Sequence, residues 1–126
     1  MGSAVTLLLD SNVLIDVLRG ERQALDWLEA QAAGLAISVI SWMEVLVGCE
    51  AHEGERVGAW LQTFRQLELD QAVAAEAVAC RKEFRMRLPD AVILATARCH
   101  GLRLVTRNTR DFPESLGIVL VPYRLG

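Results

Sequence analysis

Short apolar runs without polar alternation constrain the fold of this chain more than any other feature of its sequence. They cover about residues 5–9, 36–40, 103–105 and 118–121, and longer stretches of helical character separate them. A strand that is apolar on both sides belongs in a sheet covered on both faces, which is typical of parallel sheets. Strands that alternate with helices are joined by right-handed crossovers. We therefore predict an α/β fold with a mostly parallel central sheet.

Start and stop signals place the helices between these strands. Ser11 or Asn12 can cap a first helix that ends near Gly20, and Pro89 is suited to the first turn of a later one that ends before Gly101. The remaining helices are predicted from apolar periodicity and glycine positions. Together the signals predict helices at about 11–20, 22–33, 42–51, 54–66, 71–87 and 89–100, and a short strand at 67–69.

Composition indicates a cytoplasmic protein of one domain, residues 1–126, that has an excess of apolar surface. Hydrophobic residues make up 52% of the chain and the mean hydropathy is +0.28, yet no apolar stretch approaches the ~18 residues of a membrane span. The first residues lack a basic segment, and Asp10 interrupts the one candidate signal core. Three cysteines without a close pair favour free thiols in a reducing compartment. We expect another subunit or partner to cover the surplus apolar surface.

Charge is divided unevenly along the chain. Residues 1–80 contain 4 Arg and 12 acids, whereas residues 81–126 contain 9 Lys or Arg and 4 acids, for a net charge of −3. A protein that simply coats nucleic acid should be basic overall. A basic stripe beside an acidic pocket instead suits an enzyme that holds a polyanion, although a solvated helix face is an equal alternative.

Four carboxylates lie where strands end or helices begin, namely Asp10, Glu44, Asp90 and Asp111. Each has a structural explanation when taken singly. Asp10 could cap a helix, Ser41 and Glu44 match a capping box, Asp90 would suit a helix dipole, and Asp111 could belong to a turn. Taken together they predict a metal site, because buried carboxylates need a positive partner and no lysine lies near them in sequence.

At this point the sequence resembles a known family, the PIN-domain ribonucleases, and specifically VapC-type toxins of bacterial toxin–antitoxin pairs. The resemblance rests on four blocks that occur in the family's order between about residues 5 and 122. They are Leu8-Leu9-Asp10-Ser11-Asn12-Val13-Leu14-Ile15-Asp16, then Ile37-Ser38 with Glu44-Val45 and Gly48, then Leu88-Pro89-Asp90-Ala91 with Ala95-Thr96-Ala97, and finally Val105-Thr106-Arg107-Asn108 with Asp111-Phe112.

The resemblance implies a PIN-like three-layer fold and a ribonuclease that depends on Mg²⁺ or Mn²⁺. It implies that Asp10, Glu44 and Asp90 are catalytic metal ligands, with either Asp111 or Asn108 as a fourth ligand. Ser11, Asn12 and Thr106 are expected to position substrate. It also implies a homodimer and a small VapB-type antitoxin that covers a groove near the acids. Six basic residues are candidates for gripping RNA phosphates without reading bases, namely Arg81, Lys82, Arg85, Arg87, Arg107 and Arg110.

Three other functions are weaker matches to the sequence. A phospho-accepting signalling domain needs a lysine after a late strand, but the only lysine is Lys82, inside a predicted helix. A phosphatase with Asp10 as nucleophile normally has a second Asp where this chain has Asn12. A catalytically weak PIN-fold module that binds RNA or protein stays open, because the four acids do not establish turnover.

Overall fold

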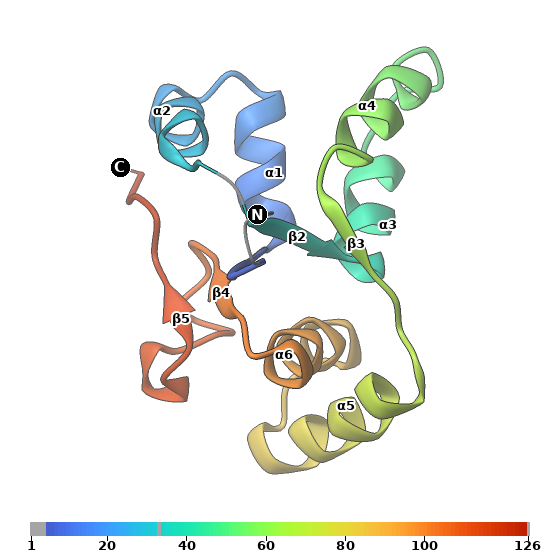
Figure 1. The fold of residues 1–126 in the computed structure, drawn as a ribbon, viewed down its shortest axis with the longest axis vertical. Coiled ribbons are helices and arrows are strands. Elements are labelled where there is room, and N and C mark those ends of the chain that lie inside the picture. Colours follow the sequence, from blue (N-terminus) through green and yellow to red (C-terminus); the bar gives the residue numbers. More distant parts are fainter. Residues whose placement is uncertain (1–4, 33, 126) are drawn as a thin grey trace.

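A computed structural model describes residues 5–32 and 34–125, and a parallel sheet forms its middle layer (Figure 1). The strands run in the order β3-β2-β1-β4-β5, and every neighbouring pair is parallel. This confirms the predicted α/β class. The strands are β1 (Leu7–Leu9), β2 (Leu35–Ser38), β3 (Arg65–Leu67), β4 (Arg103–Val105) and β5 (Val119–Leu120).

Helices cover both faces of this sheet. Alternate strand residues point to opposite sides, so Leu8 packs with α5 and α6 while Leu9 packs with α1 and α4. Figure 1 shows the pair α5 and α6 below the sheet and α1, α2 and α4 above it. The helices are α1 (Ser11–Leu18), α2 (Arg22–Ala30), α3 (Val39–Val47), α4 (Gly54–Leu61), α5 (Gln71–Phe84), α6 (Leu88–His100) and a 3₁₀ turn (Glu114–Leu116).

Several helix ends differ from the sequence prediction: α2 ends at Ala30 instead of 33, α3 at Val47 instead of 51 and α4 at Leu61 instead of 66, and the strand predicted at 67–69 is β3 at Arg65–Leu67. Two further differences have identifiable reasons. Helix α3 begins at Val39 instead of 42, because the Ser38 hydroxyl caps it by accepting the Ser41 N–H at 3.2 Å. Helix α5 ends at Phe84 instead of 87, because Arg85 adopts a left-handed conformation with φ 54°. The backbone is therefore extended just before α6, and this places Arg87 beside the first turn of that helix.

Helix α6 is the central helix that the sequence predicted. Its residues 91–97 are all buried, and Asp90 in its first turn is only 6% exposed. No helix within the described residues is long and apolar enough to cross a membrane.

The strand order reverses direction between β1 and β4. From β1 the chain moves outward to β2 and β3 on one side, and it then returns to β4 and β5 on the other. Connections leave the two central strands in opposite directions, which opens a crevice at their carboxyl ends. The first residues beyond these ends are Asp10 and Thr106.

Candidate active site

Asp10 and Thr106 meet in the crevice between the two central strands. The Thr106 hydroxyl donates a hydrogen bond of 2.7 Å to Oδ2 of Asp10, and the Asp10 N–H donates to the Val105 carbonyl at 2.9 Å. Thr106 is completely buried, and its oxygen also accepts from the Asn12 amide and the Asn108 N–H. Because its hydroxyl is enclosed, Thr106 acts on the site by orienting Asp10.

The Asp10 carboxylate is itself almost enclosed. It is 4% exposed and caps α1 by accepting the Ser11 N–H at 2.8 Å, so the capping role considered from the sequence is real. Burial raises its pKa to about 6, against the lowering effect of the hydrogen bonds from Thr106 and Ser11. The negative charges of Glu44 and Asp90 also contribute to this rise. The pocket therefore favours either a proton or a cation at Asp10.

Glu44 belongs to the same site and not to a capping box. The Ser11 hydroxyl donates to Oε1 of Glu44 at 2.9 Å and also lies 3.4 Å from Oδ1 of Asp10. The capping-box explanation for Glu44 is wrong, because Ser38 is the residue that caps α3. Glu44 then lies one turn further along that helix, with an exposed side chain that faces α1.

Arg87 joins the two remaining carboxylates. Its Nε lies 3.2 Å from Oδ2 of Asp90, and its Nη2 lies 3.8 Å from Oδ2 of Asp111. Burial raises the pKa of Asp90 although the Arg87 guanidinium lowers it, and the charge of Asp111 adds a smaller increase. Arg87 was expected to contact RNA phosphates, and here its guanidinium lies against the acids themselves.

Asn108 holds Asp111 in place. The Asn108 amide donates to Oδ2 of Asp111 at 2.8 Å, and its amide oxygen accepts the Asp111 N–H at 3.2 Å. Both ends of the Asn108 side chain are therefore engaged within the loop, whereas the Asp111 side chain is 38% exposed.

Arg107 pairs with a buried acid behind the site. Its guanidinium binds both oxygens of Asp16, which is 4% exposed, and the Tyr123 hydroxyl donates to the same carboxylate at 2.8 Å. These contacts tie the loop after β4 and the segment after β5 to α1. The guanidinium that was expected to grip phosphate is used to hold the fold together. The sequence analysis missed Asp16 and Tyr123, because no local pattern indicates that Asp16 pairs with Arg107, 91 positions away.

The other predicted RNA contacts lie on the surface. Arg81 and Lys82 occupy the last turn of α5, Arg85 follows that helix, and Arg110 belongs to the loop before Asp111, all with exposed side chains. Among residues 5–32 and 34–125, no ion pair joins these four to the acidic cluster.

The donor chemistry of this cluster fits a hard divalent cation. Carboxylate, hydroxyl and amide oxygens surround it, and these are the ligands that Mg²⁺ and Mn²⁺ prefer. Within the part of the chain that the structure describes, no three acidic, imidazole or thiol groups already converge as a ligand set. Arg87 holds two of the acids and Ser11 links the other two, so side-chain adjustment would have to accompany metal binding.

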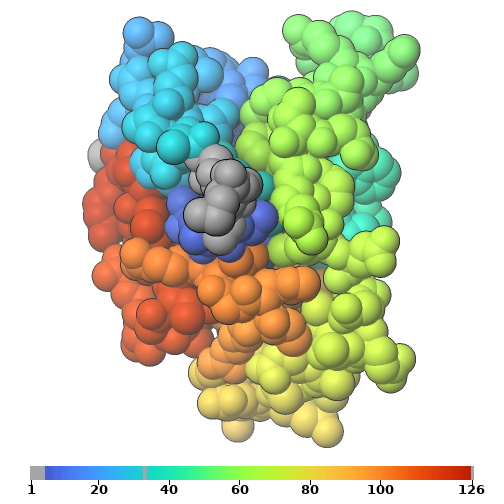
Figure 2. Space-filling view, in the orientation of Figure 1, coloured from blue at the N-terminus to red at the C-terminus, as the bar shows by residue number. Residues whose placement is uncertain are grey.

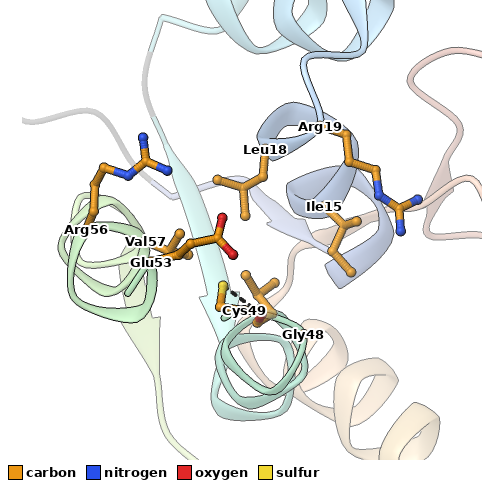
Figure 3. A pocket seen from close by; sticks show the side chains of 9 residues that line it. Ile15, Leu18, Arg19, Gly48, Cys49, Glu53, Arg56 and Val57 are labelled. Atoms are coloured by element: carbon orange, nitrogen blue, oxygen red, sulfur yellow. Dashed lines mark hydrogen bonds between the residues drawn. The ribbon is translucent and has the colours of Figure 1, made fainter. Parts of the chain in front are cut away.

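A pocket of about 230 Å³ lies between α1, α3 and α4 (Figure 3). Ile15 and Gly48 in its wall lie one helical turn beyond Ser11 and Glu44, on the same helix faces. Figure 3 shows Leu18 of α1 opposite Val57 of α4, with the Glu53 carboxylate between them. In Figure 2 a notch separates α1 and α2, in blue and cyan, from α4 in green.

Comparison with known proteins gives consistent matches over most of the chain. The profile of the PIN domain matches residues 7–114. Ribonuclease VapC10 of Mycobacterium tuberculosis is 38% identical over 114 residues, which cover 85% of this chain and 86% of the relative. Ribonuclease VapC22 of the same organism is 36% identical, covering 83% and 88%. A chain of a toxin–antitoxin complex from Klebsiella pneumoniae has a TM-score of 0.88 at 45% identity, covering 98% of this chain and 100% of that one.

Proposed function

Because this chain belongs to the PIN-domain family, we propose that it is a ribonuclease that needs Mg²⁺ or Mn²⁺ and acts as the toxin of a VapBC-type module. A cognate antitoxin would neutralise it. One observation carries the proposal: four carboxylates from remote parts of the sequence lie at the switch point of the sheet as two linked pairs, in which Ser11 links Asp10 to Glu44 and Arg87 links Asp90 to Asp111.

The residues of this cluster have different tasks. Asp10 and Asp90 are the buried acids, and they would hold the cation with help from the exposed Glu44. Asp111 is favoured over Asn108 as the fourth ligand, one that would serve a second ion, since both polar ends of the Asn108 side chain are already bonded. When bound, the cation would stabilise negative charge on the scissile phosphate and make water a better nucleophile. Thr106 and Asn12 keep the Asp10 carboxylate oriented throughout.

The RNA backbone would be held by exposed basic side chains. Arg81, Lys82, Arg85 and Arg110 are the candidates that form no ion pair with the acids among the described residues. Contacts of this kind neutralise phosphates and weaken as salt concentration rises. We expect them to set affinity more than sequence preference.

A direct test compares Asp90→Asn with Asp26→Asn on a fluorescent single-stranded RNA. Asp26 is an exposed acid of α2 paired with Arg22, so its change removes a charge without touching the crevice. We expect cleavage in the wild type and in Asp26→Asn with Mg²⁺ or Mn²⁺, and none in Asp90→Asn. Wild-type protein that binds RNA without cutting it would instead favour a catalytically weak binding module.

We propose that the antitoxin occupies the pocket along α1, α3 and α4. Its walls combine apolar side chains such as Leu18 and Ile15 with the charged Arg19, Glu53 and Arg56. An amphipathic segment could bury apolar residues there and satisfy the charges at the rim. Because Ile15 and Gly48 in its wall lie one helical turn from Ser11 and Glu44, a segment bound there would extend toward the acids and block them.

We also propose a homodimer. A hollow of about 460 Å³ lies between α3 and β3, lined by Trp42, Met43 and Leu69 among others. Met43 is 42% exposed, Leu69 is 47% and Val47 is 85%, which is unusual for large apolar side chains on one side of a small domain. Light scattering on the wild type and on Met43→Glu tests this, because a charge in the contact should favour the monomer.

A further inference from the structure

Arg87 occupies a particular place in the acidic cluster. Its guanidinium contacts Asp90 at 3.2 Å and Asp111 at 3.8 Å, so one side chain supplies positive charge to two carboxylates. Its own side chain is 74% exposed, whereas that of Asp90 is 9% exposed. The guanidinium therefore approaches the acids from solvent and covers them on that side.

The local backbone fixes this placement. Arg87 is the residue just before α6, with an extended conformation, and its side chain makes no capping bond to the helix. Asp90 lies three residues later in the first turn, so the two side chains are neighbours on one face. Arg85 in its left-handed conformation and the buried Met86 hold the chain that leads to Arg87.

The positive charge of Arg87 would repel a divalent cation bound close to it. Asp90 and Asp111 together offer the charge that would attract a second cation, but the guanidinium already lies against both. An ion entering between them would have to displace the side chain or share its oxygens against direct repulsion. Within residues 5–32 and 34–125 no side-chain cation pairs with Asp10, whose partners are the neutral Thr106, Ser11 and Asn12.

We propose that Arg87 stands in for a second metal ion, so that this protein holds one divalent cation, at Asp10 and Asp90, and excludes another from Asp111. The inference rests on the proposed function, because it presumes that the carboxylates bind a metal. Removal of the guanidinium should open a second site at Asp90 and Asp111 and tighten the first site roughly five- to tenfold, as expected when one like charge leaves the vicinity.

The test is a Mn²⁺ titration followed by the electron paramagnetic resonance signal of free Mn²⁺, which needs no substrate. Wild type should bind one ion, Arg87→Gln two, and Arg87→Lys one, because lysine keeps the charge. Arg81→Gln is the matched control, since it removes the same charge from the last turn of α5 and should behave as wild type. Arg87 is exposed, so these variants should fold, and circular dichroism checks this.

The outcomes separate the two proposals. One additional Mn²⁺ in Arg87→Gln, absent from Arg81→Gln, supports the role of Arg87. Two ions in the wild type, or the same binding curve for wild type and Arg87→Gln, would overturn it while leaving a metal-dependent nuclease intact. No binding to any of the four proteins would overturn both the inference and the proposed function.

Discussion

The hydroxyl of Thr106 and the carboxylate of Asp10 are joined by a 2.7 Å hydrogen bond across 96 positions of sequence. The bond joins the residues that follow β1 and β4, at the point where the strand order of the sheet reverses. The pairing of these two strands therefore orients the Asp10 carboxylate. Hydrogen bonds to a charged group stabilise more than neutral ones and contribute about 1.5–3 kcal/mol each. The first prediction follows from this bond.

Thr106→Val should keep the shape of the side chain but leave Asp10 without its strongest donor. We expect the metal-free protein to lose about 1–3 kcal/mol of unfolding free energy at neutral pH and RNA cleavage to fall at least tenfold. Thr109→Val, in the same loop, should show neither effect, because its side chain makes no bond to Asp10. Urea unfolding and single-turnover cleavage measure the two effects. Full cleavage by Thr106→Val would remove the orienting role.

The raised pKa of Asp10 predicts how metal-free stability depends on pH. A pKa of about 6 in the folded protein against 3.8 in the unfolded chain means that the folded state binds the proton more tightly. Its stabilising contribution is complete below pH 3.8, declines as pH rises toward 6, and is absent above that value. Asp10→Asn has no such dependence at this position. The unfolding free energy of Asp10→Asn relative to wild type, measured in EDTA, should therefore rise by about 2 kcal/mol between pH 4 and pH 7. A difference that stays flat over this range would contradict the assignment.

Divalent cations should raise the melting temperature of the wild type. A ligand that binds only the folded state at 100 times its dissociation constant adds about 2.7 kcal/mol, which corresponds to roughly 8 °C or more for a domain of this size. Asp10→Asn and Asp90→Asn should lose most of this shift, while Asp26→Asn should keep it. Differential scanning calorimetry with Mn²⁺ and with EDTA gives the comparison. Equal shifts in all four proteins would mean that the ions bind elsewhere.

Arg107→Gln should lower the free energy of unfolding, and this loss should be its main effect rather than a loss of RNA affinity. Removal of its guanidinium leaves Asp16 buried and unpaired except for Tyr123, which typically costs about 3–5 kcal/mol. The double variant Asp16→Asn with Arg107→Gln should recover part of that loss. Arg110→Gln, an exposed neighbour, should leave stability unchanged and weaken RNA affinity slightly. Thermal melts and filter binding distinguish the two arginines, and a stable Arg107→Gln with weak RNA binding would restore the phosphate-contact interpretation.

Leu18→Glu should disturb neutralisation by the antitoxin and spare cleavage. The side chain is 41% exposed in the wall of the pocket, so the change should cost little stability but place a charge where an apolar segment is expected. Val78→Glu on α5, 51% exposed, is the control and should be neutralised normally. Inhibition of RNA cleavage by increasing antitoxin measures the effect. Equal inhibition of both variants would place the antitoxin on another surface.

The alternation of strands and helices and the resemblance to the family could be read from the sequence because both depend on local patterns. Apolar runs without alternation identify buried strands, and Pro89 and Gly101 mark the two ends of α6. The placement of Glu44 needed one further fact, that the Ser38 hydroxyl and not Ser41 caps α3. Both serines are acceptable caps, and only the course of β2 decides between them.

The contacts that reach across the chain could not be predicted. Asp16 and Arg107 are ordinary surface residues by sequence, and only the adjacency of α1 to the loop after β4 brings them together. Arg87 was recognised as basic, but its position against Asp90 and Asp111 depends on the left-handed turn at Arg85. In each case the backbone of another segment determines the partner of a charged side chain.

The pairing of β1 with β4 also has a consequence during synthesis on the ribosome. Asp10 and Glu44 emerge early, but Asp90, Thr106 and the strand that aligns Asp10 follow only after most of the polypeptide has been translated. Contacts so distant in sequence are among the last to form. A nascent chain that has not yet paired β4 with β1 lacks the hydrogen bond that orients Asp10, and we expect it to cleave RNA only after that pairing has formed.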